Sequence, residues 1–344
     1  MIAARLRTPL VALEHLFSSR IQMQSSFRAA ASARRIGTVA AALCVAALPA
    51  SVGAQSESVP PVVGRWDLRV QGKDAVYPSW LEVTVSGNRT LVGRFVGRVG
   101  SARPISRVND SGGTFTFAIP PQWDRDTADL RFEGRLDGDR LAGTITLPSG
   151  ERDTFAATRA PALLHAAPAW GAPIPLFNGK DLTGWKTEGG TSHWTVIHGV
   201  LTSTASGANL VTTGTFGDFK LHVEFRYPKG GNSGVYLRGR HEVQIEDTPK
   251  RDVPLPVDIG GVYGFLTPSE NAATGPGRWQ TYDITLVGRR VTVVLNGRTI
   301  IANEIIPGIT GGALDSDEGA PGPILLQGDH LPIEYRTIRL TPAK

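Results

Sequence analysis

Apolar and polar residues alternate in short segments along most of the chain after residue 60. Alternation with a period of two is typical of β-strands that bury one face against a core. The 40 glycines and 24 prolines, many of them between these segments, supply turns and leave no long stretch with a helical period. The pattern therefore predicts an all-β protein.

Residues 60–160 carry one series of such segments. We expect strands at 62–70, 80–87, 90–99, 113–120, 129–138, 140–148 and 152–160. Tight-turn residues such as Asp137-Gly138-Asp139 separate several of them, and the short spacing favours an antiparallel meander. We predict a small antiparallel β-barrel or sandwich whose role the sequence does not reveal. Trp66, Trp80 and Trp123 could line a ligand mouth, but such residues more often belong to a core.

A second series of alternating segments occupies residues 174–344. About a dozen strands without helices predict two stacked antiparallel sheets, a jelly-roll sandwich. The segment VGRRVTVVLNGRTI is the clearest case, because Asn296-Gly297 is the preferred sequence of a two-residue hairpin turn. Residues 161–173 are rich in Pro and Ala and are expected to be a linker.

The first 54 residues have the organisation of an export signal. Arg34 and Arg35 precede the apolar run Ile36–Leu48, and small residues lead up to Ala54, after which we expect cleavage. Translation could begin at Met23, because the stretch before the apolar run is unusually long for a signal. We expect a periplasmic or secreted protein without a membrane anchor, since the apolar run is too short for a span.

Charge and cysteine content restrict the possible binding partners and the possible disulfides of the mature chain. The formal net charge is +5, but six arginines and one glutamate precede residue 55, which leaves 30 basic and 30 acidic residues afterwards. The mature chain is therefore not expected to bind nucleic acid. The single cysteine, Cys44, lies in the apolar run, so we expect no disulfide in the mature protein.

Several motifs occur in a fixed order across residues 174–344. They are LFNGKDLTGW, HWTVIHGVL, LVTTGTFGDFKLHVEFR, GGNSGVYLRGRHEVQIED, YGFL, RWQTYDITLVGRRVTVVLNG, TGGAL, GPILLQGDH and EYRTIRL. This region resembles the 3-keto-disaccharide hydrolase family, formerly a domain of unknown function, also described as 3-keto-glucoside 1,2-lyase or 3-keto-2-hydroxyglucal hydratase. The resemblance implies a concanavalin-like jelly roll and an enzyme that acts on 3-keto-glycosides.

The segment 231–247, GNSGVYLRGRHEVQIED, carries the densest group of polar side chains. Alternation sends Val235 and Val243 toward the core and Tyr236, Glu242 and Gln244 to the other face. We expect a turn near Gly239-Arg240 that brings Arg238 close to Glu242. Such a face is either a solvated sheet surface with a cross-strand ion pair or the floor of a site, and the family resemblance favours the site.

The chemistry implied by the resemblance assigns roles to these residues. A ketone at C3 acidifies the C2 proton, so a base can form an enolate that expels the C1 substituent, and water can then add. The hypothesis makes Glu242 the base or a metal ligand, and Asp247 or His330 the second acid–base group. The residues expected to hold the sugar or the enolate are Arg238, Gln244, Tyr263 and Gln327.

Two further questions stay open at this level. Oxygen-rich side chains could ligate a divalent cation such as calcium or manganese, but no spacing motif supports a metal. The alternative function is a non-catalytic carbohydrate-binding module on the same scaffold, which would tolerate loss of Glu242. If the chain is the enzyme, its substrate is a glycoside, and a sugar 3-oxidoreductase must act earlier in the pathway.

Overall fold

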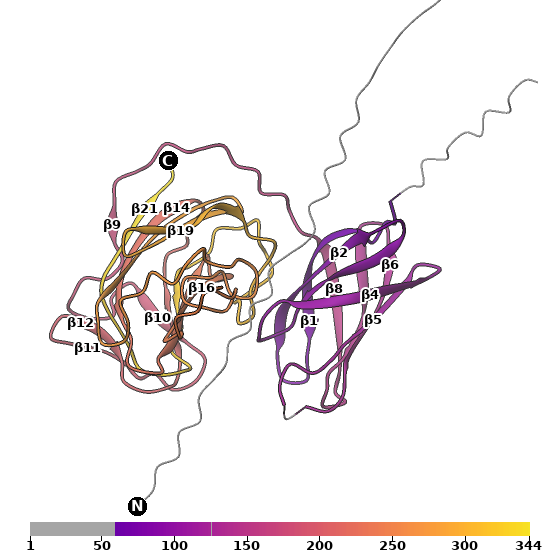
Figure 1. The fold of residues 1–344 in the computed structure, drawn as a ribbon, viewed down its shortest axis with the longest axis horizontal. Coiled ribbons are helices and arrows are strands. Elements are labelled where there is room, and N and C mark those ends of the chain that lie inside the picture. The colour runs from indigo at the N-terminus through magenta and orange to yellow at the C-terminus, as the bar shows by residue number, and fades with distance from the viewer. Residues whose placement is uncertain (1–58, 125) are drawn as a thin grey trace, which may run out of the picture. The chain divides into compact units, whose positions relative to one another are not determined.

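The computed structural model describes residues 59–124 and 126–344, which belong to one compact unit. The predicted export signal, Cys44 and the alternative start at Met23 lie outside the described residues. The described part consists of strands, turns and loops, without an α-helix (Figure 1). In that part, no helix is therefore available to cross a membrane. The expected all-β class is confirmed.

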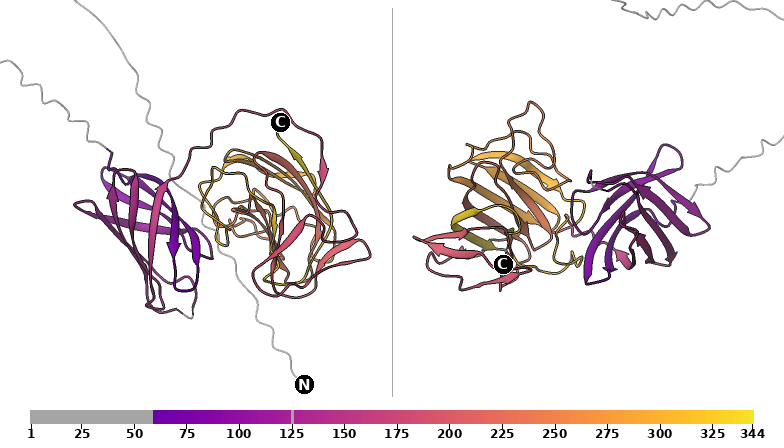
Figure 2. Two further views of the ribbon diagram at one scale, coloured as in Figure 1. Left: turned by 180° about the vertical axis from the view of Figure 1, so that it is seen from behind. Right: turned by 90° about the horizontal axis from the view of Figure 1, so that it is seen from below.

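The first eight strands form a closed antiparallel barrel in which each strand pairs with the next and β8 returns to β1 (Figure 2). The strands are β1 (Gly64–Gln71), β2 (Val76–Ser86), β3 (Thr90–Val96), β4 (Arg103–Ser111), β5 (Thr114–Ile119), β6 (Leu130–Asp137), β7 (Arg140–Thr146) and β8 (Arg152–Arg159). Closure is visible in the register, where Trp66 of β1 lies opposite Arg159 of β8. Of the two architectures expected for this region, the structure has the barrel.

Strand β4 is absent from the seven segments expected from the sequence. Its residues include Arg103, Pro104 and Arg107, and only two of its nine side chains, Ile105 and Val108, are buried. A strand with so few inward apolar side chains does not produce the alternation on which the expectation relied. The barrel interior is filled by aromatic rings, with Phe132 stacked 4.5 Å from Phe117.

The three tryptophans of this region have different environments. Trp66 is fully buried in the barrel core, as the common behaviour of such residues suggests. Trp80 faces out of the barrel and is also fully buried, because it packs against Ile309 and Phe265. Trp123 is 43% exposed and lies in the connection between β5 and β6.

The remaining strands form a sandwich of two antiparallel sheets, as the jelly-roll prediction requires. The five-stranded sheet has the order β10 (Trp185–Glu188), β13 (Asn209–Thr212), β20 (Leu325–Leu326), β15 (Asn232–Leu237), β16 (His241–Glu246). The eight-stranded sheet has the order β11 (Trp194–Ile197), β12 (Val200–Ser203), β21 (Ile333–Pro342), β14 (Phe219–Arg226), β17 (Gln280–Val287), β18 (Arg290–Leu295), β19 (Arg298–Ile305), and β9 (Ile174–Pro175) also pairs with β21. The core between the sheets buries one face of each.

The Pro/Ala-rich segment 161–173 runs along the sandwich. The Pro161 carbonyl accepts a hydrogen bond of 3.0 Å from Arg289 Nε, and His165 Nδ1 lies 2.7 Å from Asp218 Oδ2. Further along, Trp170 forms an isolated β-bridge with Ala343. These contacts fix the path of the segment although it has no regular structure of its own.

Candidate functional site

The five-stranded sheet has a polar outer face, opposite the face that packs into the sandwich core. Val235 and Val243 pair with each other and are fully buried in that core. Because side chains alternate along a strand, the neighbouring residues of β15 and β16 point the other way. On that side Gly234 lies opposite Gln244. The backbone N–H of Gln327 donates a hydrogen bond of 3.0 Å to the Gly234 carbonyl. Gln327, Gly234 and Gln244 therefore form a polar row across three adjacent chain segments.

Glu242 is the buried carboxylate of this face. Its side chain is on β16, only 3% of the residue is exposed, and Tyr236 Oη donates a hydrogen bond of 3.0 Å to its Oε2. Burial raises the pKa of Glu242 to about 8, although the Tyr236 hydrogen bond and the charge of His330 oppose the shift. The carboxyl group therefore has a pKa suited to removing a proton near neutral pH.

Gly234 makes space for the Glu242 carboxylate. A Cβ at Gly234 would come within 2.8 Å of Glu242 Cγ and would press still closer on Oε1. The backbone of Gly234 is not in the left-handed region, so the turn geometry does not require a glycine here. The residue is needed because a side chain would displace the carboxylate that lies over it.

His330 and Tyr263 approach the same carboxylate from two loops. His330 Nδ1 lies 2.7 Å from Asp329 Oδ1, and this hydrogen bond, with smaller help from the charge of Glu242, raises the pKa of His330. Tyr263 donates its backbone N–H to the Glu242 carbonyl at 3.0 Å, which aligns its segment beside β16. Burial and then the Glu242 carboxylate raise the pKa of Tyr263. A carboxylate, an imidazole and a phenol are thus gathered on one face.

Two amide oxygens of the polar row have no hydrogen-bond donor. Gln244 Oε1 and Gln327 Oε1 are both buried, and neither finds a partner within residues 59–124 and 126–344. An unsatisfied buried acceptor costs free energy, so its presence needs a reason. Acceptors that flank the Gly234 gap beside Glu242 are suited to the hydroxyl groups of a sugar.

The expected contact between Arg238 and Glu242 is wrong. The register pairs Leu237 with His241 and Tyr236 with Glu242, so the turn consists of Arg238, Gly239 and Arg240 rather than of Gly239 and Arg240. Arg238 adopts a left-handed backbone conformation with φ of 53°. This turn sends its side chain away from the polar face, and the residue that faces Glu242 across the hairpin is Tyr236.

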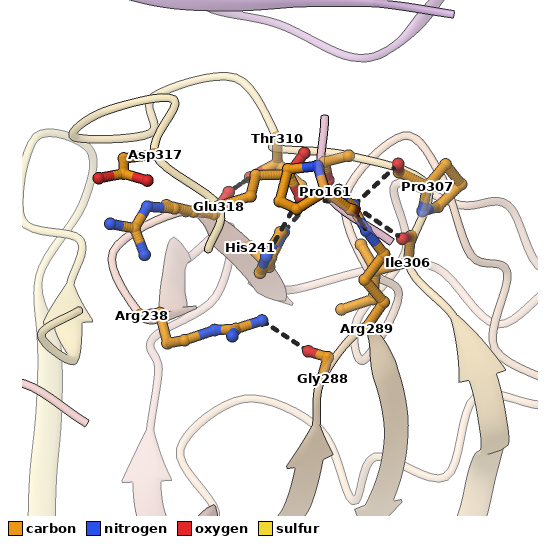
Figure 3. A network of polar contacts seen from close by, with 12 residues as sticks. Pro161, Arg238, His241, Gly288, Arg289, Ile306, Pro307, Thr310, Asp317 and Glu318 are labelled. Atoms are coloured by element: carbon orange, nitrogen blue, oxygen red, sulfur yellow. Dashed lines mark hydrogen bonds and ion pairs between the residues drawn. The ribbon is translucent and has the colours of Figure 1, made fainter. Parts of the chain in front are cut away.

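Arg238 belongs instead to a buried ionic cluster formed by Arg238, His241, Arg289 and Glu318 (Figure 3). Arg289 Nη1 lies 2.5 Å from Glu318 Oε2, and both residues are at most 2% exposed. Arg238 Nη2 donates a hydrogen bond of 2.6 Å to the Gly288 carbonyl. Burial, and next the charge of Arg238, hold the pKa of His241 well below its usual range, so this imidazole is neutral.

Asp247 lies at the end of β16 and stabilises a turn. Its Oδ2 accepts a hydrogen bond of 2.8 Å from the Gly230 backbone, and its own backbone donates to the Gly231 carbonyl at 2.9 Å. These contacts give Asp247 a structural role, and its acid–base role stays a prediction. Asp329, which the sequence interpretation did not assign, is the carboxylate that contacts His330.

The sequence interpretation also missed Tyr236 and Gly234 as parts of this site. The alternation already placed Tyr236 on the polar face, so the correct length of the turn would have found it. No role for Gly234 followed from the sequence pattern, and the packing shows its purpose. Among the described residues, no group of three or more His, Cys, Asp or Glu side chains is arranged to hold a metal ion.

Comparison with known proteins assigns the sandwich to a family. The family described as 3-keto-alpha-glucoside-1,2-lyase-like domain matches residues 172–341. A 3-keto-disaccharide hydrolase of Bacteroides thetaiotaomicron is 33% identical over 98 residues, which are 25% of this chain and 33% of that protein. The chain therefore aligns with about a third of the length of this curated relative.

Two crystal structures from Parabacteroides distasonis ATCC 8503, each provisionally named a glycosyl hydrolase, are also similar. One is 30% identical, with 51% of this chain and 90% of that chain covered and a TM-score of 0.44. The other is 20% identical, with 50% and 94% covered and a TM-score of 0.41. The family match confirms the resemblance found from the ordered motifs, and residues 172–341 of the chain belong to the 3-keto-alpha-glucoside-1,2-lyase-like domain family.

Proposed function

We propose that the sandwich cleaves glycosides of 3-keto sugars on the outer face of its five-stranded sheet, with Glu242 as the base. The observation that carries the proposal is the Glu242 carboxyl group, which is buried beside Tyr236 and has a pKa raised to about 8. Membership of the family supports the choice of a 3-keto sugar as substrate.

The proposed reaction begins at C2 of the sugar. Glu242 takes the C2 proton, and the electron pair forms an enolate with the C3 oxygen. The enolate then expels the C1 substituent by breaking the C1–O bond, and the protonated His330 gives a proton to the leaving oxygen. Water adds across the resulting double bond, with hydroxide to C1 and a proton to C2, so that the net change is hydrolysis.

The surrounding groups bind and orient the sugar. Gln244 and Gln327 accept hydrogen bonds from its hydroxyls through the two amide oxygens that have no partner in the part of the chain that the structure describes. Tyr263 contributes a half-buried ring at the edge of the same face. Tyr236 positions Glu242, because its hydroxyl lies between the Glu242 carboxylate and the Gly311 carbonyl, 2.9 Å away. Asp329 fixes the ring of His330 and favours its protonated form.

The test replaces Glu242 with Gln in the full chain. General-base catalysis contributes about 10²–10⁴-fold, so kcat/KM for 3-keto-trehalose or 3-keto-lactose should fall by that amount in Glu242→Gln. A reducing-sugar assay measures the product. The matched control is Glu224→Gln on the opposite sheet, because Arg336 and Thr337 bind that carboxylate and the Arg336 hydrogen bond lowers its pKa. Activity in Glu242→Gln close to that of Glu224→Gln would remove Glu242 from the mechanism.

Substrate controls separate catalysis from simple binding. The unoxidised sugars trehalose and lactose should not be cleaved, because their C2 proton lacks a neighbouring ketone. A protein that binds sugars but turns over neither the oxidised nor the unoxidised forms would instead be a carbohydrate-binding module. The proposal also places the protein outside the cytoplasm, on the basis of its predicted signal, and after an oxidoreductase that produces the 3-keto sugar.

A further inference from the structure

The two ends of the barrel differ in the length of their connections. At one end, short turns of two or three residues at 87–89, 112–113 and 138–139 join the strands. At the other end the connections are 72–75, 97–102, 120–129 and 147–151, which are four to ten residues long. Long loops grouped at one end of a rigid barrel are where binding sites are usually found.

A cavity of about 370 Å³ opens between these longer connections. Its wall is mostly apolar and includes Phe95, Ile119, Ile145 and Leu147. Cavities of about 300–1,000 Å³ with such walls accept small organic molecules. The barrel region lies outside the residues that match the family, so the family offers no explanation for the cavity.

One polar pair lies in the apolar interior beside this cavity. Tyr77 on β2 and Asp153 on β8 both line the cavity, and Tyr77 Oη donates a hydrogen bond of 2.6 Å to Asp153 Oδ2. Asp153 is only 2% exposed, and alternation along β8 directs its side chain inward. Its other oxygen, Oδ1, has no partner in the described part of the chain. A buried carboxylate with a free acceptor is costly for folding alone, whereas a ligand that donates a hydrogen bond would satisfy it.

The mouth of the cavity combines an aromatic side chain with balanced charge. Trp123 is 43% exposed there and offers its ring to the opening. Apart from Asp153, the charged residues of the wall are three cations and three acids: Lys73, Arg98, Arg103, Asp74, Asp126 and Glu151. With Asp153 included, the wall has three cations and four acids, and this near balance disfavours an anion and suits an uncharged ligand.

We propose that this end of the barrel binds an uncharged hydroxylated aromatic compound. The ligand hydroxyl donates to Asp153 Oδ1, and its ring lies against the apolar wall and Trp123. A sugar is less suitable, because it carries hydroxyls on all sides and the deep part of the cavity offers one polar pair. The inference does not depend on the function proposed for the sandwich.

Binding of 2-naphthol and of 2-methoxynaphthalene to the full chain tests the proposal. The second compound has the same rings but no hydroxyl donor. A hydrogen bond to a charged group contributes about 1.5–3 kcal/mol, so 2-naphthol should bind at least about tenfold more tightly, as measured by fluorescence anisotropy. Equal affinities would overturn the role of Asp153, and displacement of 2-naphthol by lactose would overturn the choice of ligand class.

Variants locate the binding site. Asp153→Asn should reduce the affinity for 2-naphthol about tenfold and leave that for 2-methoxynaphthalene unchanged. Trp123→Ala, at a residue too exposed to decide whether the barrel folds, should weaken binding of both compounds. Asp139→Asn, in a tight turn at the other end, is the matched control and should change neither. Unchanged binding in Trp123→Ala would overturn the proposal even if Asp153→Asn failed to fold, and Glu242→Gln should bind both compounds normally.

Discussion

One hairpin contributes to two polar regions of very different character. From the hairpin of β15 and β16, Glu242 and Gln244 enter the polar face, whereas Arg238 of the turn and His241 enter the ionic cluster with Arg289 and Glu318. In the cluster, the Glu318 carboxylate lies 2.5 Å from a guanidinium nitrogen. On the polar face, the Glu242 carboxylate accepts its one side-chain hydrogen bond within residues 59–124 and 126–344 from the Tyr236 hydroxyl, and its pKa rises to about 8.

The contrast shows that burial alone does not identify a reactive acid. Both glutamates are nearly inaccessible to water. A directly bound cation favours the charged form of a buried carboxyl group, whereas burial without one favours the protonated form, as it does for Glu242. Replacing each glutamate should therefore affect different properties of the protein.

The largest effect on folding is expected for Glu318→Ala. Removing one partner of a buried ion pair leaves Arg289 without the carboxylate that binds it, and such changes cost up to about 3–5 kcal/mol of unfolding free energy. Urea unfolding of the full chain measures the loss. Activity per folded molecule should remain, in contrast to Glu242→Gln.

The double variant Arg289→Met/Glu318→Met controls for the side-chain volume. It removes both charges and should recover most of the lost stability, because an apolar pair can replace a buried ion pair. If Glu318→Ala alone were as stable as the wild type, the ionic cluster would not have the stabilising role that distinguishes it from the polar face.

An intermediate effect on activity is expected for Gly234→Ala. The added methyl group would displace the Glu242 carboxylate, and misplacement of a reacting group by about 1 Å can cost about 10²-fold in rate. kcat/KM for a 3-keto-disaccharide should fall by that amount with little change in the unfolding midpoint. Gly217→Ala is the matched control, since no heavy atom of the described residues lies within 4 Å of a Cβ at that position. Equal activity of the two variants would contradict the proposed placement of Glu242.

The smallest effect is a shift in the pH profile of Tyr236→Phe. In the wild type, the mechanism needs an ionised Glu242 together with a protonated His330, so kcat/KM should depend on pH as a bell in which the pKa of Glu242 is about 8. The Tyr236 hydroxyl stabilises the ionised form, and its removal should raise the pKa of Glu242 further. The limb of the profile that reports Glu242 should therefore move to a higher pH in the variant, and a profile in which both limbs stay in place or move down would contradict this.

Stability gives a second measurement of the same group. Because the pKa of Glu242 is raised on folding, its contribution is fully present below about 4.5 and is lost as the pH increases to about 8. Thermal unfolding of the wild type should show this loss, and unfolding of Glu242→Gln should lack it. An identical pH dependence in the two proteins would show that the group is not perturbed.

The sequence predicted the architecture better than the site. Alternating segments predicted both β regions, and in the barrel β4 escaped because few of its side chains are apolar and buried. The face that carries Glu242, Gln244 and Gln327 followed from the same alternation. The position of Arg238 did not follow from the alternation, because one additional turn residue changes which side chains meet across the hairpin. Residues 238–240 carry no signal that fixes the length of the turn.

The place of β21 has a consequence for biosynthesis. Although β21 (Ile333–Pro342) is the last strand, it lies inside the larger sheet, between β12 and β14. The barrel strands are complete at residue 159 and can pair while the ribosome is still translating the sandwich. The larger sheet cannot be completed until about 100 residues after β14 have been synthesised. Until then no strand lies between β12 and β14. A nascent chain stalled before residue 333 would therefore expose two strand edges, and it is the species for which chaperone protection matters most.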